Sequence, residues 1–211
     1  MNVDQNQAIQ IGRLLRSGIN GCVIGCQVAQ INTPVFAGLA RIPLDESGAY
    51  QVYGLIFDIH VDDDGLVRQL ITSPQIESNI ISDNRLNRNI PLEISVLFLG
   101  YEQEKRIFHL IPPRPPLTLD EIFLCTPDET CRFTNAGHFG YFRHILRQPD
   151  LPVGELLASF VRLTTSAQTA AGNLDWTTRA VQELITLLRD DYPTLMAVLG
   201  ALSDAQIFQE A

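Results

Sequence analysis

Lysine is almost absent from this sequence of 211 residues: Lys105 is the only one, so arginines make up the rest of the 15 basic residues. Acidic residues number 24, which gives a net charge of -9. Because each phosphate that a protein neutralises requires a Lys or an Arg, this excess of acid argues against direct, high-affinity binding of nucleic acid. The planar guanidinium groups instead favour fixed pairs with carboxylates and protein interfaces.

Long apolar runs and familiar catalytic motifs are absent as well. No run approaches the 18 apolar residues of a membrane span, and the N-terminal residues do not have the pattern of a signal peptide. The sequence contains no P-loop, no G-x-G-x-x-G, no G-x-S-x-G and no H-E-x-x-H. The four cysteines are expected to be reduced thiols. We therefore expect a cytoplasmic protein that has no cofactor, no enzymatic activity and no contact with a membrane.

Strand-length apolar segments dominate the first part of the chain. Turn residues separate them, for instance DESGA at 45–49 and DDDG at 62–65. The expected strands cover residues 23–31, 34–42, 50–59, 92–101 and 106–111. Several short strands without an intervening helix favour a closed β-barrel over a βαβ sheet. The sequence therefore predicts a small closed β-barrel as a domain of residues 1–120.

A proline-rich segment, IPPRPPL at 111–117, predicts a stiff exit from the barrel, and helical periodicity follows it. Residues 121–211 are expected to form a C-terminal α-helical region, with a flexible joint at 164–173. Its expected helices cover 150–163 and 175–191, a third begins near Pro193, and the capping pattern SDAQ at 203–206 starts a last short one.

Three consecutive aspartates, Asp62, Asp63 and Asp64, stand before Gly65 and invite a search for a metal site. An EF-hand loop aligned on Gly65 would begin at His60 and end at Ile71, and neither residue is a suitable ligand there. The favoured interpretation is a polar turn between two strands. The alternative is a Mg²⁺ site of these aspartates or of Asp58, which would make the protein a metal-dependent hydrolase or a nuclease accessory.

Residues 125–147 offer a second alternative, a zinc or nucleic-acid adaptor. Cys125, Cys131, His138 and His144 have the spacing C-x5-C-x6-H-x5-H, in which the first pair is too far apart for a usual structural zinc site. Aromatic and basic residues alternate in GHFGYFRHILR at 137–147, and such a mixture can stack on bases. On a helix, Phe142, Ile145 and Leu146 would instead face a core.

Two polar segments supply candidate interface residues. In SDNRLNRN at 82–89, Asp83, Arg85 and Arg88 could fix a loop or face a neighbouring subunit through charge-assisted hydrogen bonds. Arg114 lies within PPRPP, which is either a connector or a ligand for a polyproline-binding domain.

Four segments between residues 9 and 120 together resemble a known family: IQIGRLL, YQVYGLIFDIHVDDDGLVRQLI, PLEISVLFLGY and HLIPPRPPL. They look like a HAS-barrel, the small β-barrel at the N-terminus of HerA-type hexameric ATPases. In that family the barrels form a ring that contacts partners such as a nuclease. Because no nucleotide-binding motif follows the barrel here, the resemblance implies neither ATPase activity nor a family site residue.

The expected fold is thus a HAS-like β-barrel followed by α-helices. The expected function is that of a non-catalytic interaction or assembly module. It would either oligomerise or dock on a protein partner, such as a HerA-type ATPase or an associated nuclease.

Overall fold

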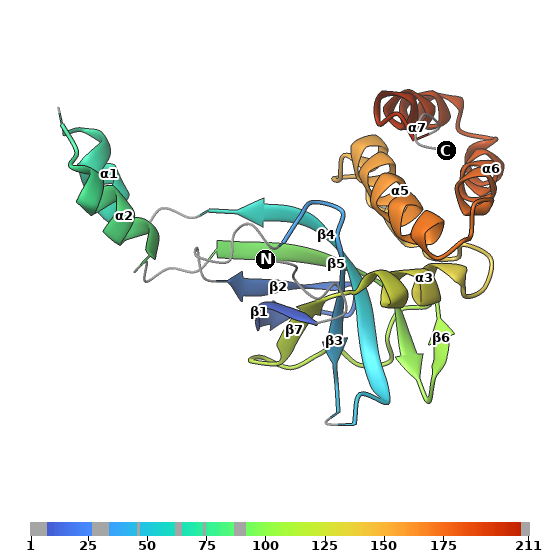
Figure 1. Cartoon of the computed structure of the whole chain (residues 1–211), viewed down its shortest axis with the longest axis horizontal. Coiled ribbons are helices and arrows are strands. Elements are labelled where there is room, and N and C mark those ends of the chain that lie inside the picture. The colour runs from blue at the N-terminus through green and yellow to red at the C-terminus, as the bar shows by residue number, and fades with distance from the viewer. Residues whose placement is uncertain are drawn as a thin grey trace.

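A computed structural model of the chain describes residues 8–26, 34–45, 47–61, 65–73, 75–86 and 92–207 (Figure 1). The strands are β1 Ile9–Ser17, β2 Gly21–Cys26, β3 Leu39–Pro43, β4 Tyr50–His60, β5 Leu92–Gln103, β6 Arg106–Phe108 and β7 Glu121–Leu124. The helices are α1 Leu66–Ile71, α2 Ser78–Leu86, α3 Pro127–Asn135, α4 Phe142–Leu146, α5 Val153–Ala170, α6 Trp176–Leu188 and α7 Tyr192–Asp204.

Six of the strands close into an antiparallel barrel, as the sequence predicts. Their order is β2-β1-β7-β3-β4-β5, and β5 pairs back onto β2 to complete the circle. The seventh strand, β6, pairs with the last residues of β5 and extends the sheet beyond the closed part. A closed barrel leaves no row of unpaired backbone groups along its wall, which removes the open edges of a flat sheet.

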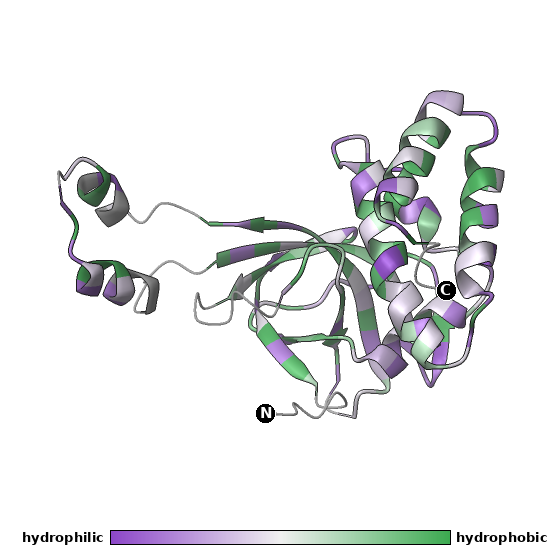
Figure 2. Cartoon of the chain, turned by 45° about the horizontal axis from the view of Figure 1, so that its top comes forward, coloured by the Kyte–Doolittle hydropathy of each residue, from purple (hydrophilic) through white to green (hydrophobic). Residues whose placement is uncertain are grey.

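The barrel has two buried faces because its interior and part of its exterior are both covered. On β4, Val52 and Ile56 belong to the core inside the barrel, whereas Tyr53 and Leu55 belong to a second core outside it. Side chains of a strand point alternately to opposite faces, so an 11-residue strand serves both cores. Figure 2 shows hydrophobic residues in the barrel strands and in the helices beside them.

Helices α3 to α7 form a layer on the outside of the barrel (Figure 1). Their buried side chains, among them Phe133, Phe160 and Trp176, share one hydrophobic core with Tyr53 and Leu99 of the barrel wall. The C-terminal helices therefore pack on the barrel of their own chain, and the two parts are joined by a continuous apolar contact.

Local signals explain where the helices begin. Thr126 and Glu129 form a capping box at the start of α3, in which the Thr126 hydroxyl accepts from Glu129 N at 3.2 Å and Glu129 Oε2 accepts from Thr126 N at 2.9 Å. A helix, α7, begins near Pro193 as the sequence predicts, and Pro193 occupies its first turn. Its N-cap is Asp191, which the sequence assigns to the end of the preceding helix. Asp175 stands at the N-cap of α6, but its side chain pairs with Arg179 rather than with the backbone.

Several expectations about secondary structure are wrong. Residues 164–170, expected to be a joint, continue α5, and Ser203 and Asp204 end α7 rather than start another helix. The proline-rich segment does not leave the barrel, because it connects β6 to β7, and β7 pairs with both β1 and β3. Residues 121–124, which the sequence assigns to the helical region, are thus a barrel strand.

The stretch between β4 and β5 holds two helices, α1 and α2, where the sequence predicts only β-structure. We call the described residues 65–73 and 75–86 the helical insertion. No helix in the described part of the chain combines the length and the apolar character needed to cross a bilayer.

Candidate functional site

The helical insertion lies at the end of the long β4–β5 ribbon, away from the helical layer (Figure 1). The two strands remain paired up to His60 and Glu93, which are directly opposite each other in the register. Gly65 precedes α1 with φ at 77°, a left-handed conformation that glycine adopts without steric cost. Gly65, the last residue of the DDDG segment, thus allows the chain to change direction immediately before α1.

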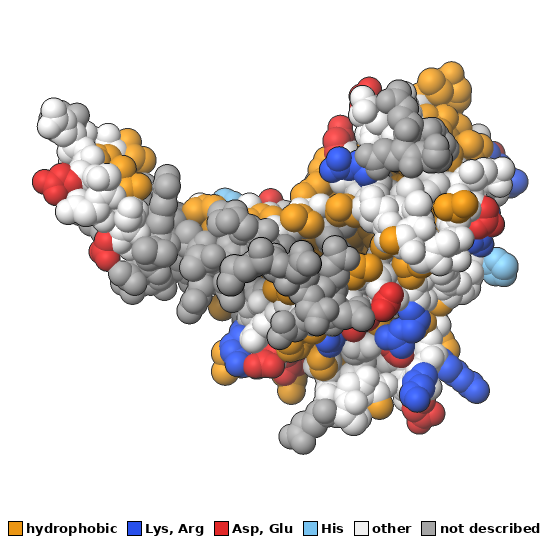
Figure 3. All heavy atoms as spheres, viewed as in Figure 1, with side chains coloured by type: hydrophobic (Ala, Val, Ile, Leu, Met, Phe, Trp, Pro, Cys, Tyr) orange, Lys and Arg blue, Asp and Glu red, His pale blue; other side chains and the backbone are white. Residues whose placement is uncertain are grey.

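Isoleucines are exposed on the insertion although they are large and apolar. Ile71 is 72% exposed, and Ile76, Ile80 and Ile81 are between 37% and 39% exposed. Figure 3 shows hydrophobic side chains gathered on the insertion, at the left of the view. Neither of the two hydrophobic cores of the described chain includes a residue of the insertion. Exposed apolar side chains that cluster on a protruding element mark a surface for another molecule.

An ion pair between β1 and β5 lies close to the point where the insertion joins the barrel. Arg16 on β1 donates to both carboxylate oxygens of Glu93, at 3.1 and 2.6 Å. Hydrogen bonding to Arg16 is the main reason why the pKa of Glu93 lies below its usual value. This two-point contact ties β1 to the start of β5, the strand that follows the insertion.

The candidate interface residues fall at two distant places. Asp83 lies on α2 with its side chain exposed, and Arg85 lies on the same helix. The side chain of Arg85, and Arg88 as a whole, are outside the described residues. Arg114 lies in the β6–β7 connection, with its guanidinium 5.2 Å from the ring centre of Tyr50. Tyr50 begins β4, whereas the insertion follows its end, so about 33 Å of strand separates Arg114 from the insertion.

The aspartates Asp62, Asp63 and Asp64 lie outside the described residues. The segment LVRQLI after Gly65 is the helix α1, so the prediction of a turn between two strands is wrong in its second half. Asp58, the other carboxylate considered for a metal, is exposed on β4 beside a bulge in the pairing with β5. Among the described residues, no group of three or more His, Cys, Asp or Glu side chains could hold a metal ion.

The four residues considered for zinc have separate surroundings. Cys131 is buried in α3 and Cys125 is partly buried after β7, and burial raises the pKa of both thiols. His144 Nε2 donates to the carbonyl of His109 at 3.1 Å, whereas His138 is exposed. Phe142 and Ile145 are fully buried, as expected for a helix that faces a core.

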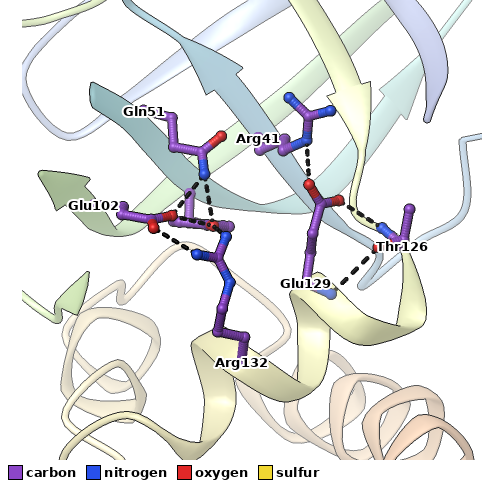
Figure 4. A network of polar contacts seen from close by, with 7 residues as sticks. Arg41, Gln51, Glu102, Thr126, Glu129 and Arg132 are labelled. Atoms are coloured by element: carbon purple, nitrogen blue, oxygen red, sulfur yellow. Dashed lines mark hydrogen bonds and ion pairs between the residues drawn. The ribbon is translucent and has the colours of Figure 1, made fainter. Parts of the chain in front are cut away.

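A buried polar cluster between the barrel and α3 was not predicted from the sequence (Figure 4). Glu102 on β5 is 3% exposed and accepts hydrogen bonds from Gln51 at 2.6 Å, Tyr53 at 2.8 Å and Arg132 at 2.5 Å. Arg132 also donates to the Tyr53 hydroxyl at 2.9 Å. The clue in the sequence was the pair Gln51 and Tyr53, two residues apart and therefore on one face of β4.

Electrostatics keep this cluster ionised. Burial acts to raise the pKa of Glu102, but hydrogen bonds from Gln51, Tyr53 and Arg132 outweigh it, so the pKa lies below the ordinary value. Burial is the largest cause of the raised pKa of Tyr53, which stays a protonated donor. Because both oxygens of the Glu102 carboxylate have partners within the chain, one of them on α3, the cluster joins α3 to the barrel.

Glu129 makes a second link between the same elements. Its carboxylate lies 2.7 Å from Arg41 of β3 while it completes the capping box of α3 (Figure 4). The first turn of α3 is therefore fixed to β3 and its last turn to β5.

No protein-family model matches the chain, and no curated protein matches it.

Proposed function

We propose that the chain is a non-catalytic assembly module: a HAS-type barrel whose helical insertion binds the insertion of a second copy of the same chain. The observation that carries the proposal is the exposure of Ile71, Ile76, Ile80 and Ile81 on an element that protrudes from the barrel. The closed antiparallel barrel agrees with the kind of domain that the family resemblance implies, whereas that family has an ATPase domain after its barrel and this chain has helices.

The two helices of the insertion are too short to be stable by themselves. Its helices have six and nine residues, and isolated helices of that size are marginal in water unless an apolar face is packed. In a two-fold dimer the same surface of each chain meets its copy, and an apolar surface is complementary to itself. A second copy is therefore the occupant that we propose. Docking on a different protein, such as a HerA-type ATPase or a nuclease, is the alternative that the experiment separates.

Size-exclusion chromatography with light scattering tests this directly. The double variant Ile71→Ser/Ile80→Ser removes two apolar side chains from the insertion. The control Leu117→Ser/Leu174→Ser removes two exposed leucines elsewhere, which are 72% and 75% exposed. At concentrations up to about 100 μM, the wild type and the control are expected to associate, and the insertion variant to be a monomer. A wild type that is monomeric at that concentration, or an insertion variant that associates as strongly as the control, contradicts the proposal.

A reducing compartment suits this assignment. None of the four cysteines forms a disulfide, and Cys22 and Cys26 are buried inside the barrel. Cytoplasmic proteins keep such thiols reduced, so we place the module in the cytoplasm.

A further inference from the structure

A pocket of about 590 Å³ lies between the barrel and the helical layer, and no described residue of the helical insertion lines it. Leu39 of β3 and Leu124 of β7 line it from the barrel side. Phe160, Leu163 and Ala167 of α5 line it from the helical side. Its volume lies within the range of roughly 300 to 1,000 Å³ that is common for small-molecule sites.

The lining is apolar with a few hydroxyl groups. None of the described residues that line the pocket carries a charge, and its polar side chains are Thr126, Thr130, Thr164 and Ser166. Thr126 is engaged in the capping box of α3, and Ser166 donates to the carbonyl of Arg162 at 3.3 Å. An ionised ligand would lose its hydration here without gaining a counter-charge, so the lining favours a neutral molecule.

Thr164 distinguishes this pocket from a gap in the packing. Its side chain is 1% exposed, yet its hydroxyl has no hydrogen-bond partner. Buried hydroxyls without a partner are rare, because each forfeits the hydrogen bonds that water would provide. In a helix a threonine commonly donates to the carbonyl four residues earlier, and Thr134 on α3 does so at 2.7 Å. Thr164 therefore keeps an unused donor and acceptor beside an apolar pocket.

We infer that this pocket binds a neutral, largely apolar small molecule whose single polar group forms a hydrogen bond with the Thr164 hydroxyl. The apolar part of the ligand contacts Leu39, Leu124 and Phe160. This site is independent of the proposed self-association, because it shares no residue with the insertion.

Nile red, a neutral apolar dye with a carbonyl group, is a suitable probe in fluorescence titrations of the full chain. Ala167→Trp places a large side chain in the pocket. Ala197→Trp is the matched control, since Ala197 is exposed on α7 and does not line the pocket. Thr164→Val keeps the shape of the side chain and removes its hydroxyl. If Ala167→Trp does not fold, as judged by thermal melting, Ala170→Trp replaces it, because Ala170 is exposed and lines the same pocket.

We expect the wild type and Ala197→Trp to bind one dye per chain with equal affinity. Ala167→Trp, or Ala170→Trp in its place, is expected to bind at least about ten-fold more weakly. Thr164→Val is expected to bind about five-fold more weakly, as for the loss of one neutral hydrogen bond. Absence of binding by the wild type overturns the inference, as does unchanged binding by the pocket-filling variant. Binding that is lost in Ile71→Ser/Ile80→Ser and kept in Ala167→Trp also overturns it, because the dye would then occupy the insertion.

Discussion

Gln51 on β4 and Glu102 on β5 lie directly opposite each other in the register, and Gln51 Nε2 donates to Glu102 Oε2 across the strands at 2.6 Å. Both side chains are buried beneath α3, so the pair forms the floor of the contact between the barrel and the helical layer. Arg132 completes that contact from α3 by donating to the other carboxylate oxygen.

Replacement of Glu102 by glutamine is expected to destabilise the protein by about 2 to 3 kcal/mol. Donors face both carboxylate oxygens, Arg132 on one side and Gln51 with Tyr53 on the other. Either orientation of a glutamine amide would therefore place its NH2 group against a donor. Urea unfolding measures the change.

The matched control is Glu121→Gln. Glu121 pairs with Arg13 at 2.6 Å, but both side chains are about half exposed. Its loss is expected to change the free energy of unfolding by no more than about 0.5 kcal/mol. Equal effects of the two variants would show that the buried cluster contributes no more than a surface pair.

Thr164→Val is expected to raise the free energy of unfolding by about 1 kcal/mol in the absence of any ligand, because it removes a buried hydroxyl that has no partner. Thr134→Val is the counterpart. The Thr134 hydroxyl donates to Thr130 O at 2.7 Å and accepts from the buried Gln168 at 2.8 Å, so its loss is expected to cost about 1 to 2 kcal/mol. Changes in melting temperature, relative to the wild type, that have the same sign for both variants would contradict this assignment of hydrogen bonds.

Acidification is expected to destabilise the protein below about pH 6.5. Burial is the main cause that lowers the pKa of His109 and of His144, with further contributions from Arg143 and, for His144, from Arg147. As the pH falls below 6.5, the ordinary pKa of histidine, the unfolded chain therefore binds more protons than the folded chain. The free energy of unfolding then decreases until the pH is below the lowered pKa of the folded chain.

Urea unfolding between pH 7.5 and about pH 5 measures this loss of stability. This pH range lies above 4.5, the ordinary pKa of a glutamate such as Glu102. His144→Gln keeps a donor for the carbonyl of His109 and is expected to flatten the dependence on pH. His138→Gln, at an exposed position, should leave the dependence unchanged. A wild type whose stability is constant over this range would refute the prediction.

Replacement of residues 62–91 by Asn-Gly is expected to leave the barrel and the helical layer folded. His60 and Glu93 are already paired, so a two-residue turn between Val61 and Leu92 continues an existing antiparallel ribbon. Because neither core includes a described residue of the insertion, the melting temperature is expected to change by no more than about 5 °C in the monomer. A shortened chain that does not fold would show that the insertion is part of the structural framework. Light scattering on the same chain is expected to show a monomer.

The apolar runs of β4 and β5 predict the barrel, and the run on β4 also indicates that both faces of this strand are covered. A strand with one buried face alternates apolar and polar residues, whereas Val52 to Ile56 form an uninterrupted buried run. Such a run indicates cover on both faces, and the second cover is the helical layer. The contact between the two parts was therefore encoded in the pattern.

Short elements were the ones that the sequence did not reveal. The helix Leu66–Ile71 has six residues, a length at which an apolar run fits a strand and a helix equally well. The strand Glu121–Leu124 has four, and its partners β1 and β3 lie about 80 residues or more away, so no local pattern indicates the pairing. In α5, Thr164 and Gln168 are buried one turn apart, and a polar buried face gives no hydrophobic period.

The position of β7 in the chain also governs the order of events during synthesis. β7 lies between β1 and β3 in the barrel, yet it is the last strand in the described part of the chain. Until residue 124 has left the ribosome, both neighbours carry open edges that another nascent chain could pair with. The capping box of α3 follows at once, so the same short stretch of polypeptide closes the wall and starts the layer that covers it.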